Sequence, residues 1–179
     1  MLTDQLCEMY QCTSSPDWRW FEPYLTYANA RFPQALFEAH ITTKNLTYLK
    51  IGEGSLNFLI KKQIIEDKML PIVNKGLHMK NDEKELYDQQ PLEAACMVEA
   101  AMTAFRITGN KKYLKTARIA FNWFLGKNSQ NVEVYNPKTG GCYDGITSQG
   151  TNLNQGAEST ICYLMARLEL ENNMLNKIQ

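Results

Sequence analysis

The fold of this chain is indicated by two stretches that repeat at an offset of 65 residues, 43-TKNLTYLKIGEGSLNFL-59 and 108-TGNKKYLKTARIAFNWF-124. The matches include Tyr48 with Tyr113 and Asn57 with Asn122. In the second copy, apolar residues recur at helical spacing from residue 113 to residue 124. Each copy therefore predicts a helix, including the glycine-containing "GEGSLN" that would otherwise suggest a phosphate loop. A repeat of this size predicts a stacked supersecondary unit.

A second helix is expected before each copy of the repeat. "PQALFEAHI" begins at Pro33 and "PLEAACMVEAAMTAF" begins at Pro91, and proline suits a first helical turn because its missing N–H has no partner there anyway. A third helix of this kind, "NQGAESTICYLMARLEL", begins at Asn154, and another is expected over residues 2–12. The chain is therefore predicted to hold about three helical hairpins.

The lengths of the connections predict which end of the hairpins carries function. The links "TTK" and "TGN" are short and require antiparallel neighbours. The connections over about 63–90 and 127–154, and the segment before Pro33, are long and are expected to emerge together on one rim. The sequence thus predicts an all-α single domain over residues 1–179, with its functional residues on that rim.

Composition limits the class of protein. The chain has 179 residues, enough for one domain, and its zero formal net charge argues against a nucleic-acid partner. No stretch approaches the roughly 20 apolar residues of a membrane helix, and the N-terminus does not read as a secretory signal. The five cysteines form no CxxC pair, and Cys96 and Cys162 stand in apolar helical runs. We expect reduced thiols and a cytoplasmic location.

The predicted rim collects aromatic, acidic and amide side chains from three segments. The candidate residues are Trp18, Arg19, Trp20 and Glu22 in the first segment, Tyr87, Asp88, Gln89, Gln90 and Glu93 in the second, and Tyr143, Asp144, Gln155 and Glu158 in the third. Aromatic rings stack on sugar rings, and carboxylates and amides bind hydroxyl groups, so this mixture predicts a saccharide ligand.

Two carboxylates across a groove can also act as acid and base in glycoside hydrolysis. Among the five acidic candidates, Asp88 and Asp144 are the first choice for such chemistry, with Trp18, Trp20, Tyr143 and Gln89 shaping the sugar site. The two histidines, His40 and His78, are isolated in the sequence. We therefore expect neither a metal site nor a cofactor.

Each of these features also has a purely structural interpretation. Asp88 or Asn154 can serve only as helix caps, and Glu93 can serve only to favour the helix dipole. Trp18 and Trp20 can seal the end of the helical array, and Arg19 can pair with an acidic neighbour. The stretch "TGGCYDG", residues 139–145, can be a tight turn whose glycines need positive φ.

Several stretches resemble a known family. "WRWFEPYLTYANARFPQAL", "DQQPLEA", "TGNKKYL", "WFLGKN", "YNPKTGGCYDGI" and "NQGAEST" are similar to the α/α-toroid region at the C-terminal end of some bacterial glycosyltransferase-like proteins. That region belongs to the six-hairpin glycosidase-like class, and the resemblance covers about Trp18 to Leu170. It implies inner helices beginning near Pro33, Pro91 and Asn154, and outer helices at the repeats.

The chain departs from that family in length. A six-hairpin ring needs roughly twice as many residues, so about three hairpins would form half a ring, and the nucleotide-sugar-binding part of a glycosyltransferase is lacking. The helix "ICYLMARLEL", residues 161–170, is apolar nearly all round and has no following partner. We therefore expect self-association, or pairing with a missing half of the toroid. The alternative function is a structural or protein-interaction module without catalysis.

Overall fold

The computed structural model describes residues 2–73, 78–80 and 85–175. Its helices are α1 (Leu2–Thr13), α2 (Arg31–Thr43), α3 (Leu46–Gln63), α4 (Pro91–Thr108), α5 (Lys111–Asn122) and α6 (Ala157–Leu175). Its strands are β1 (Tyr24–Leu25), β2 (Ile64–Ile65), β3 (Lys68–Met69), β4 (His78–Met79), β5 (Gly145–Thr147) and β6 (Gly150–Asn152). All the predicted helices are present: α1 and α4 start at the predicted residues, and the other starts differ by two or three residues.

The two copies of the repeat form their links in the same way. Lys44 after α2 and Gly109 after α4 are both left-handed, with φ of 59° and 66°. Asn45 then caps α3 by accepting a hydrogen bond from the N–H of Thr47 at 2.9 Å, and Asn110 caps α5 in the same manner at 3.1 Å. The left-handed residue turns the chain and the asparagine starts the next helix, so each link yields an antiparallel hairpin.

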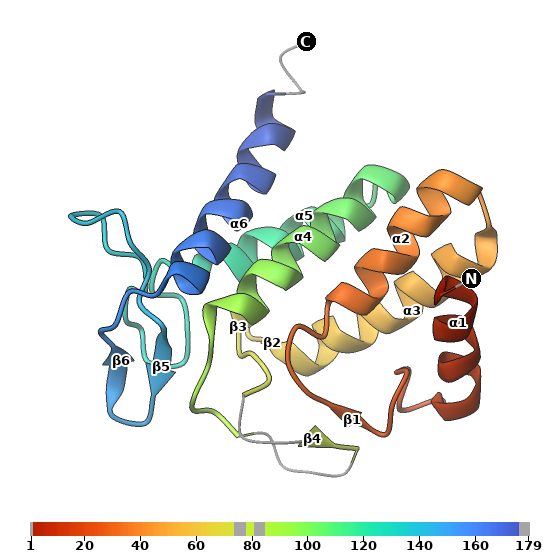
Figure 1. Cartoon of the computed structure of the whole chain (residues 1–179), viewed down its shortest axis with the longest axis horizontal. Helices are drawn as coiled ribbons and strands as arrows, with labels where there is room; N and C mark the ends of the chain where they lie inside the picture. The colour runs from red at the N-terminus through yellow and green to blue at the C-terminus, as the bar shows by residue number, and fades with distance from the viewer. Residues whose placement is uncertain (1, 74–77, 81–84, 176–179) are drawn as a thin grey trace.

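The hairpins stack so that one layer of helices covers another. Figure 1 shows α2, α4 and α6 side by side, with α3 and α5 behind them. Helix α4 is central, and its residues 93–104 are all buried. Equivalent tyrosines of the two repeat copies also join α1, α3 and α5. The hydroxyl of Tyr48 in α3 donates to Asp4 of α1 at 2.6 Å, and that of Tyr113 in α5 donates to Glu53 of α3 at 3.0 Å.

Close packing explains a glycine in the middle of a helix. Gly52 lies inside α3, where a Cβ would come within 2.8 Å of the Phe37 ring of α2. The helical interpretation of "GEGSLN" is therefore confirmed, and the glycine serves the approach of α2 to α3 rather than a phosphate.

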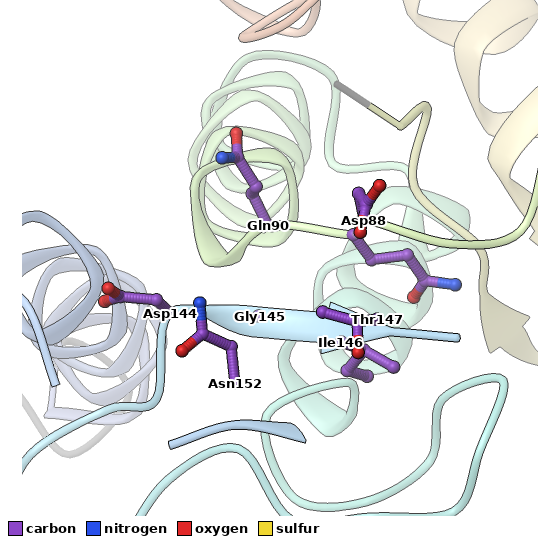
Figure 2. A pocket seen from close by; sticks show the side chains of 8 residues that line it. Asp88, Gln90, Asp144, Gly145, Ile146, Thr147 and Asn152 are labelled. Atoms are coloured by element: carbon purple, nitrogen blue, oxygen red, sulfur yellow. The ribbon is translucent and has the colours of Figure 1, made fainter. Parts of the chain in front are cut away.

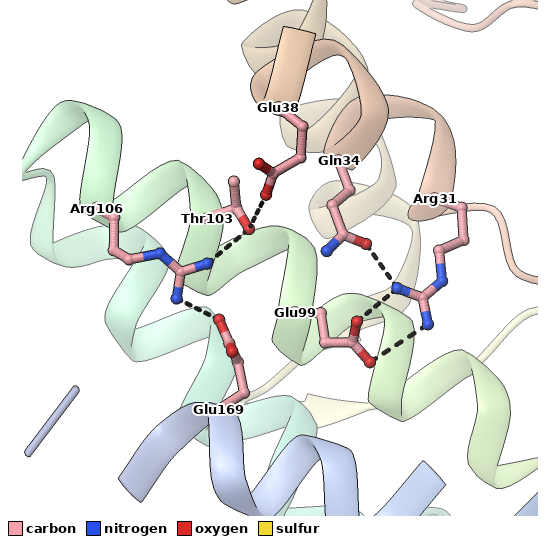
Figure 3. A network of polar contacts seen from close by, with 7 residues as sticks. All are labelled: Arg31, Gln34, Glu38, Glu99, Thr103, Arg106 and Glu169. Carbon is pink, nitrogen blue, oxygen red and sulfur yellow. Dashed lines mark hydrogen bonds and ion pairs between the residues drawn. The ribbon is translucent and has the colours of Figure 1, made fainter. Parts of the chain in front are cut away.

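A polar network crosses the face that α2, α4 and α6 share. Its members are Arg31, Gln34, Glu38, Glu99, Thr103, Arg106 and Glu169 (Figure 3). Arg31 of α2 donates to both carboxylate oxygens of Glu99 on α4, at 2.5 and 3.3 Å. Arg106 of α4 donates to Thr103 and to Glu169 of α6. The network therefore fixes the relative positions of three helices, because bidentate guanidinium contacts are strongly directional.

The prediction of an all-α fold is wrong. Three two-stranded antiparallel sheets accompany the helices, pairing β1 with β4, β2 with β3, and β5 with β6. All of them lie in the long connections, where the backbone has left the helices and still needs hydrogen-bond partners. The β2–β3 hairpin turns at Glu66 and Asp67, which both have positive φ, 51° and 57°. Neither residue gives the usual asparagine-glycine signal of such a turn.

The sheets and bridges join the three long connections at one end of the helices. Tyr24 pairs with Met79, which links the first connection to the second. Gln89 pairs with Ile146, which links the second to the third. Figure 1 shows the three connections together at the lower end of the layer, as the alternation of short and long links predicts. No helix within the described ranges is long and apolar enough to cross a membrane.

Candidate functional site

A pocket of about 230 Å³ opens where the second and third long connections meet. We call it the rim pocket; it is lined by Asp88, Gln89, Gln90, Asp144, Gly145, Ile146, Thr147 and Asn152. Figure 2 shows Asp88 and Gln90 on the segment that leads into α4, and Asp144 and Asn152 beside the β5–β6 hairpin. The two carboxylates that the sequence favoured most, Asp88 and Asp144, therefore line one pocket.

Backbone pairing holds the two walls of the rim pocket together. The N–H of Gln89 donates to the carbonyl of Ile146, and the N–H of Ile146 donates to the carbonyl of Gln89, both at 3.0 Å. Gly145 makes this approach possible, because a Cβ there would lie 2.2 Å from the Gln89 carbonyl oxygen. Its φ of 151° also favours glycine. The site is therefore built on a bridge that only glycine permits.

The side chain of Gln89 belongs to the scaffold of the site. It is buried, and its Nε2 donates to the carbonyl of Leu86 at 2.6 Å and to Oγ of Ser129 at 2.8 Å. Its Oε1 accepts from Nε1 of Trp123 at 2.8 Å. The predicted contact of this amide with a sugar is not favoured by these bonds, and Gln89 instead ties the segment before α4 to the third connection.

Asp144 is an ionised carboxylate that ties the start of helix α6 to the third connection. Its Oδ1 accepts from the N–H of Gly156 at 2.8 Å and from the hydroxyl of Ser159 at 2.6 Å, and its Oδ2 accepts from Asn154. These hydrogen bonds, led by that of Ser159, lower the pKa of Asp144 below its ordinary value. Gly156 permits the contact, since a Cβ there would lie 2.9 Å from Oδ1.

Asp88 has an unusual backbone conformation at the edge of the same pocket. Its φ is 65°, in the left-handed region that few residues other than glycine adopt, although aspartate does so more readily than most. Such residues cluster at binding sites, where the surrounding structure holds them in place. Here the neighbouring Gln89–Ile146 bridge supplies that constraint.

Glu93 does not line the rim pocket but lies buried in the first turn of α4. Only 3% of its surface is exposed. Burial raises the pKa of Glu93 to about 7, although hydrogen bonds from the N–H of Ala28 and from Asn29 act in the opposite direction. The side-chain amide of Gln63, which is also buried, lowers the pKa of Glu93 in the same way. Glu93 therefore joins the first connection to α4, and ligand has no access to it.

The structure places the predicted tryptophans in the core rather than at a ligand. Trp18 and Trp20 are 1% and 0% exposed. Trp18 packs edge-to-face on Phe58 with ring centroids 5.0 Å apart, and its Nε1 donates to the carbonyl of Glu22 at 2.7 Å. Trp20 stacks on the same phenylalanine. Their faces are covered by protein, as the interpretation of these residues as a seal for the array requires.

The remaining candidates are scattered along the rim. Glu22 accepts from the hydroxyl of Tyr24 at 3.2 Å, and Arg19 lines a different pocket. Tyr87 is 40% exposed directly before Asp88, and Glu158 is exposed in the first turn of α6.

The third connection holds Tyr143 and Gln155 by local hydrogen bonds. The Tyr143 hydroxyl accepts from Asn136 at 2.9 Å, and Oε1 of Gln155 accepts from Thr139 at 2.7 Å. Thr147 and Asn152 line the rim pocket but were not among the candidates. Recognising "DGITSQGTN", residues 144–152, as a β-hairpin would have brought them to the same edge as Asp144.

In comparisons with protein-family models and with curated proteins, no family model and no curated protein matches this sequence. Within the residues that the structure describes, no group of three or more histidine, cysteine, aspartate or glutamate side chains is placed to hold a metal ion. The rim pocket itself presents carboxylates, amides and one hydroxyl group.

Proposed function

We propose that this chain is a carbohydrate-binding helical module, and that its rim pocket receives one sugar residue. The observation that carries the proposal is that Asp88 and Gln90 from one connection and Asp144 and Asn152 from another line a single pocket. Carboxylates accept hydrogen bonds from sugar hydroxyls, and amides both donate and accept. The resemblance of the sequence to six-hairpin glycosidase-like proteins supports the same class of ligand.

The size of the pocket favours a single sugar ring. Its volume of about 230 Å³ is below the roughly 300–1,000 Å³ of pockets that enclose a drug-sized ligand. The exposed ring of Tyr87, next to Asp88 in the chain, offers an apolar face for the C–H surface of a further sugar residue. A saccharide chain would therefore enter by one ring and extend along the rim.

The protonation state of Asp144 favours binding of a saccharide over its hydrolysis. A general acid must hold a proton near neutral pH, and the three hydrogen bonds to Asp144 instead stabilise its ionised form. Glu93 has a pKa suited to proton transfer, but it is buried and does not line the pocket. Asp144 thus serves as a fixed acceptor for sugar hydroxyls.

The experiment is a screen of soluble saccharides and immobilised glycans against the chain and two variants. Asp88→Asn keeps the shape of the side chain but removes its charge, and we expect binding to weaken about tenfold because a hydrogen bond to a charged group is lost. Glu85→Gln, an exposed acid three residues away, should bind as the unaltered chain does. Absence of any saccharide binding, or equal binding by both variants, would contradict the proposal.

A second candidate function, self-association as an interaction module, is favoured by an apolar stripe on α6. Ile161, Leu164, Met165 and Leu168 are 53%, 50%, 44% and 47% exposed and follow one side of the helix. The order of these four residues along the helix is symmetric about its middle. An antiparallel α6 of a second copy would therefore place Ile161 against Leu168 and Leu164 against Met165. Sedimentation velocity tests this: the chain should dimerise and Leu164→Glu should remain monomeric, whereas a monomeric parent chain would exclude it.

A further inference from the structure

A second pocket, of about 400 Å³, lies between a turn of the first connection and helix α3. Asp17 and Arg19 line it from the turn, and Gly54, Phe58 and Lys61 line it from α3. We call it the turn pocket. It shares no lining residue with the rim pocket.

The walls of the turn pocket are held by backbone and aromatic contacts. Ser15 and Trp18 close the turn with two backbone hydrogen bonds, of 2.9 and 3.1 Å. Trp18 then packs edge-to-face on Phe58 of α3, which fixes the turn to the helix. Arg19 stands between the buried Trp18 and Trp20, so its backbone is anchored on both sides while its side chain is exposed. The pocket is therefore preformed, which reduces the entropy cost of binding.

The charges in the turn pocket are unbalanced. Arg19 and Lys61 form no ion pair with any residue that the structure describes, although both line the pocket. The carboxylate of Asp17 is already engaged, because Oδ1 accepts from Oγ of Ser15 at 2.7 Å and from Nζ of Lys80 at 3.1 Å. Two positive charges therefore remain without a matching anion, in a chain whose formal net charge is zero.

We propose that the turn pocket binds the phosphate group of a small phosphomonoester. A phosphomonoester carries about −1.5 to −2 charges at neutral pH, which matches the two uncompensated cations. The guanidinium of Arg19 can donate two parallel hydrogen bonds to phosphate oxygens, and Lys61 adds a point charge. Pro16 and the largely buried Phe58, which also line the pocket, offer apolar atoms to the organic part of the ligand, and Asn57 offers an amide. This site does not depend on saccharide binding at the rim pocket.

The first test is a calorimetric titration of the full chain with inorganic phosphate, glucose 6-phosphate and acetate. Both phosphate compounds should bind, and acetate, with one charge, should bind at least about tenfold more weakly. Tighter binding of glucose 6-phosphate than of inorganic phosphate would support a phosphomonoester as the ligand. Equal affinity of the two would overturn the assignment of a phosphomonoester, because the contacts of the pocket with the organic part would then contribute nothing.

Variants then locate the site, and a lysine outside the pocket controls for nonspecific attraction. Arg19→Gln and Lys61→Gln should each raise the Kd for glucose 6-phosphate about tenfold, because each removes a charge-assisted hydrogen bond. Asp17→Asn should lower that Kd about threefold, because it removes the one negative charge at the pocket. Lys111→Gln, which alters an exposed lysine at the start of α5, should leave it unchanged.

Folding is a minor concern for these variants because Arg19, Lys61 and Asp17 are all exposed. Circular dichroism and the urea midpoint should confirm this for each of them. The proposal is overturned if neither phosphate compound binds the parent chain, or if Arg19→Gln and Lys61→Gln bind glucose 6-phosphate as the parent chain does. It is also overturned if Lys111→Gln weakens binding as much as they do, because attraction to the overall surface charge would then explain the result.

Discussion

The buried carboxyl of Glu93 gives the chain a pH dependence opposite to that of an ordinary acid. Its pKa is about 7 in the folded chain and near 4.5 in an unfolded one. The folded state therefore binds the proton more tightly, so the contribution of Glu93 to stability is complete below pH 4.5 and is lost as the pH rises through 7. Burial also raises the pKa of the neighbouring Cys96 thiol to about 12, so this thiol stays neutral over the same pH range.

The size of the effect follows from the pKa difference. Each pKa unit corresponds to about 1.4 kcal/mol, so the unfolding free energy should fall by about 2 to 3 kcal/mol between pH 5 and pH 8 on account of Glu93 alone. Glu93→Gln keeps an oxygen that can accept the hydrogen bond from Ala28 but cannot ionise. The variant should therefore lack this decline and should exceed the parent chain in stability at pH 8.

Urea unfolding at half-unit pH steps measures the difference. With the slope of roughly 1–3 kcal/mol per molar urea that small domains show, the midpoint of the parent chain should fall by about 1 M relative to that of Glu93→Gln. Glu85→Gln, which alters an exposed acid, should follow the parent chain. Parallel pH profiles for the parent chain and Glu93→Gln would refute the reasoning, because Glu93 would then titrate alike in both states.

Three further substitutions or reactions test other parts of the structure. Asp144→Ala should lower the unfolding free energy by about 1–2 kcal/mol in urea at pH 7, because the start of α6 loses its hydrogen bonds to the Asp144 carboxylate, and the loss should shrink in acid as the lowered pKa of Asp144 is passed. Gly145→Ala should cost at least about 2 kcal/mol by the same measurement, since its Cβ would meet the Gln89 carbonyl; Gly150→Ala, at a positive φ in open space, should cost less. Iodoacetamide should alkylate only Cys12 in the native chain, as mass spectrometry of peptides would show, because the other four cysteines are buried.

The helical part of the fold could be predicted because its signals are local. The repeat at an offset of 65 residues contains the cap residues Asn45 and Asn110 themselves, and the structure uses both. The strands could not be predicted in this way. They are two or three residues long, and Glu66 and Asp67 turn the β2–β3 hairpin without glycine. The β2–β3 and β5–β6 pairs are local hairpins, but β1 pairs with β4 from another long connection, which no local window of sequence shows.

The candidate site was predictable in part for a similar reason. Asp88 and Asp144 precede a helix and a hairpin at the same end of the layer, so the order of short and long links brings them together. The same order places Trp18 and Trp20 at that end, but it cannot say whether an indole faces solvent or the core. Packing against Phe58 decides that both are buried. Asn152 was missed because its position depends on the hairpin register, Gly145 opposite Asn152.

The most direct test of the saccharide-binding proposal is an NMR titration of the isotope-labelled chain with a saccharide that binds in the screen. We expect the largest shift changes at the backbone amides of Gln89, Gln90 and residues 145–147, which line the rim pocket. The amides of Trp18 and Trp20 should change little, because their indoles are buried away from it. Changes centred on the tryptophans or on α6, with none at residues 145–147, would contradict the assignment of the site.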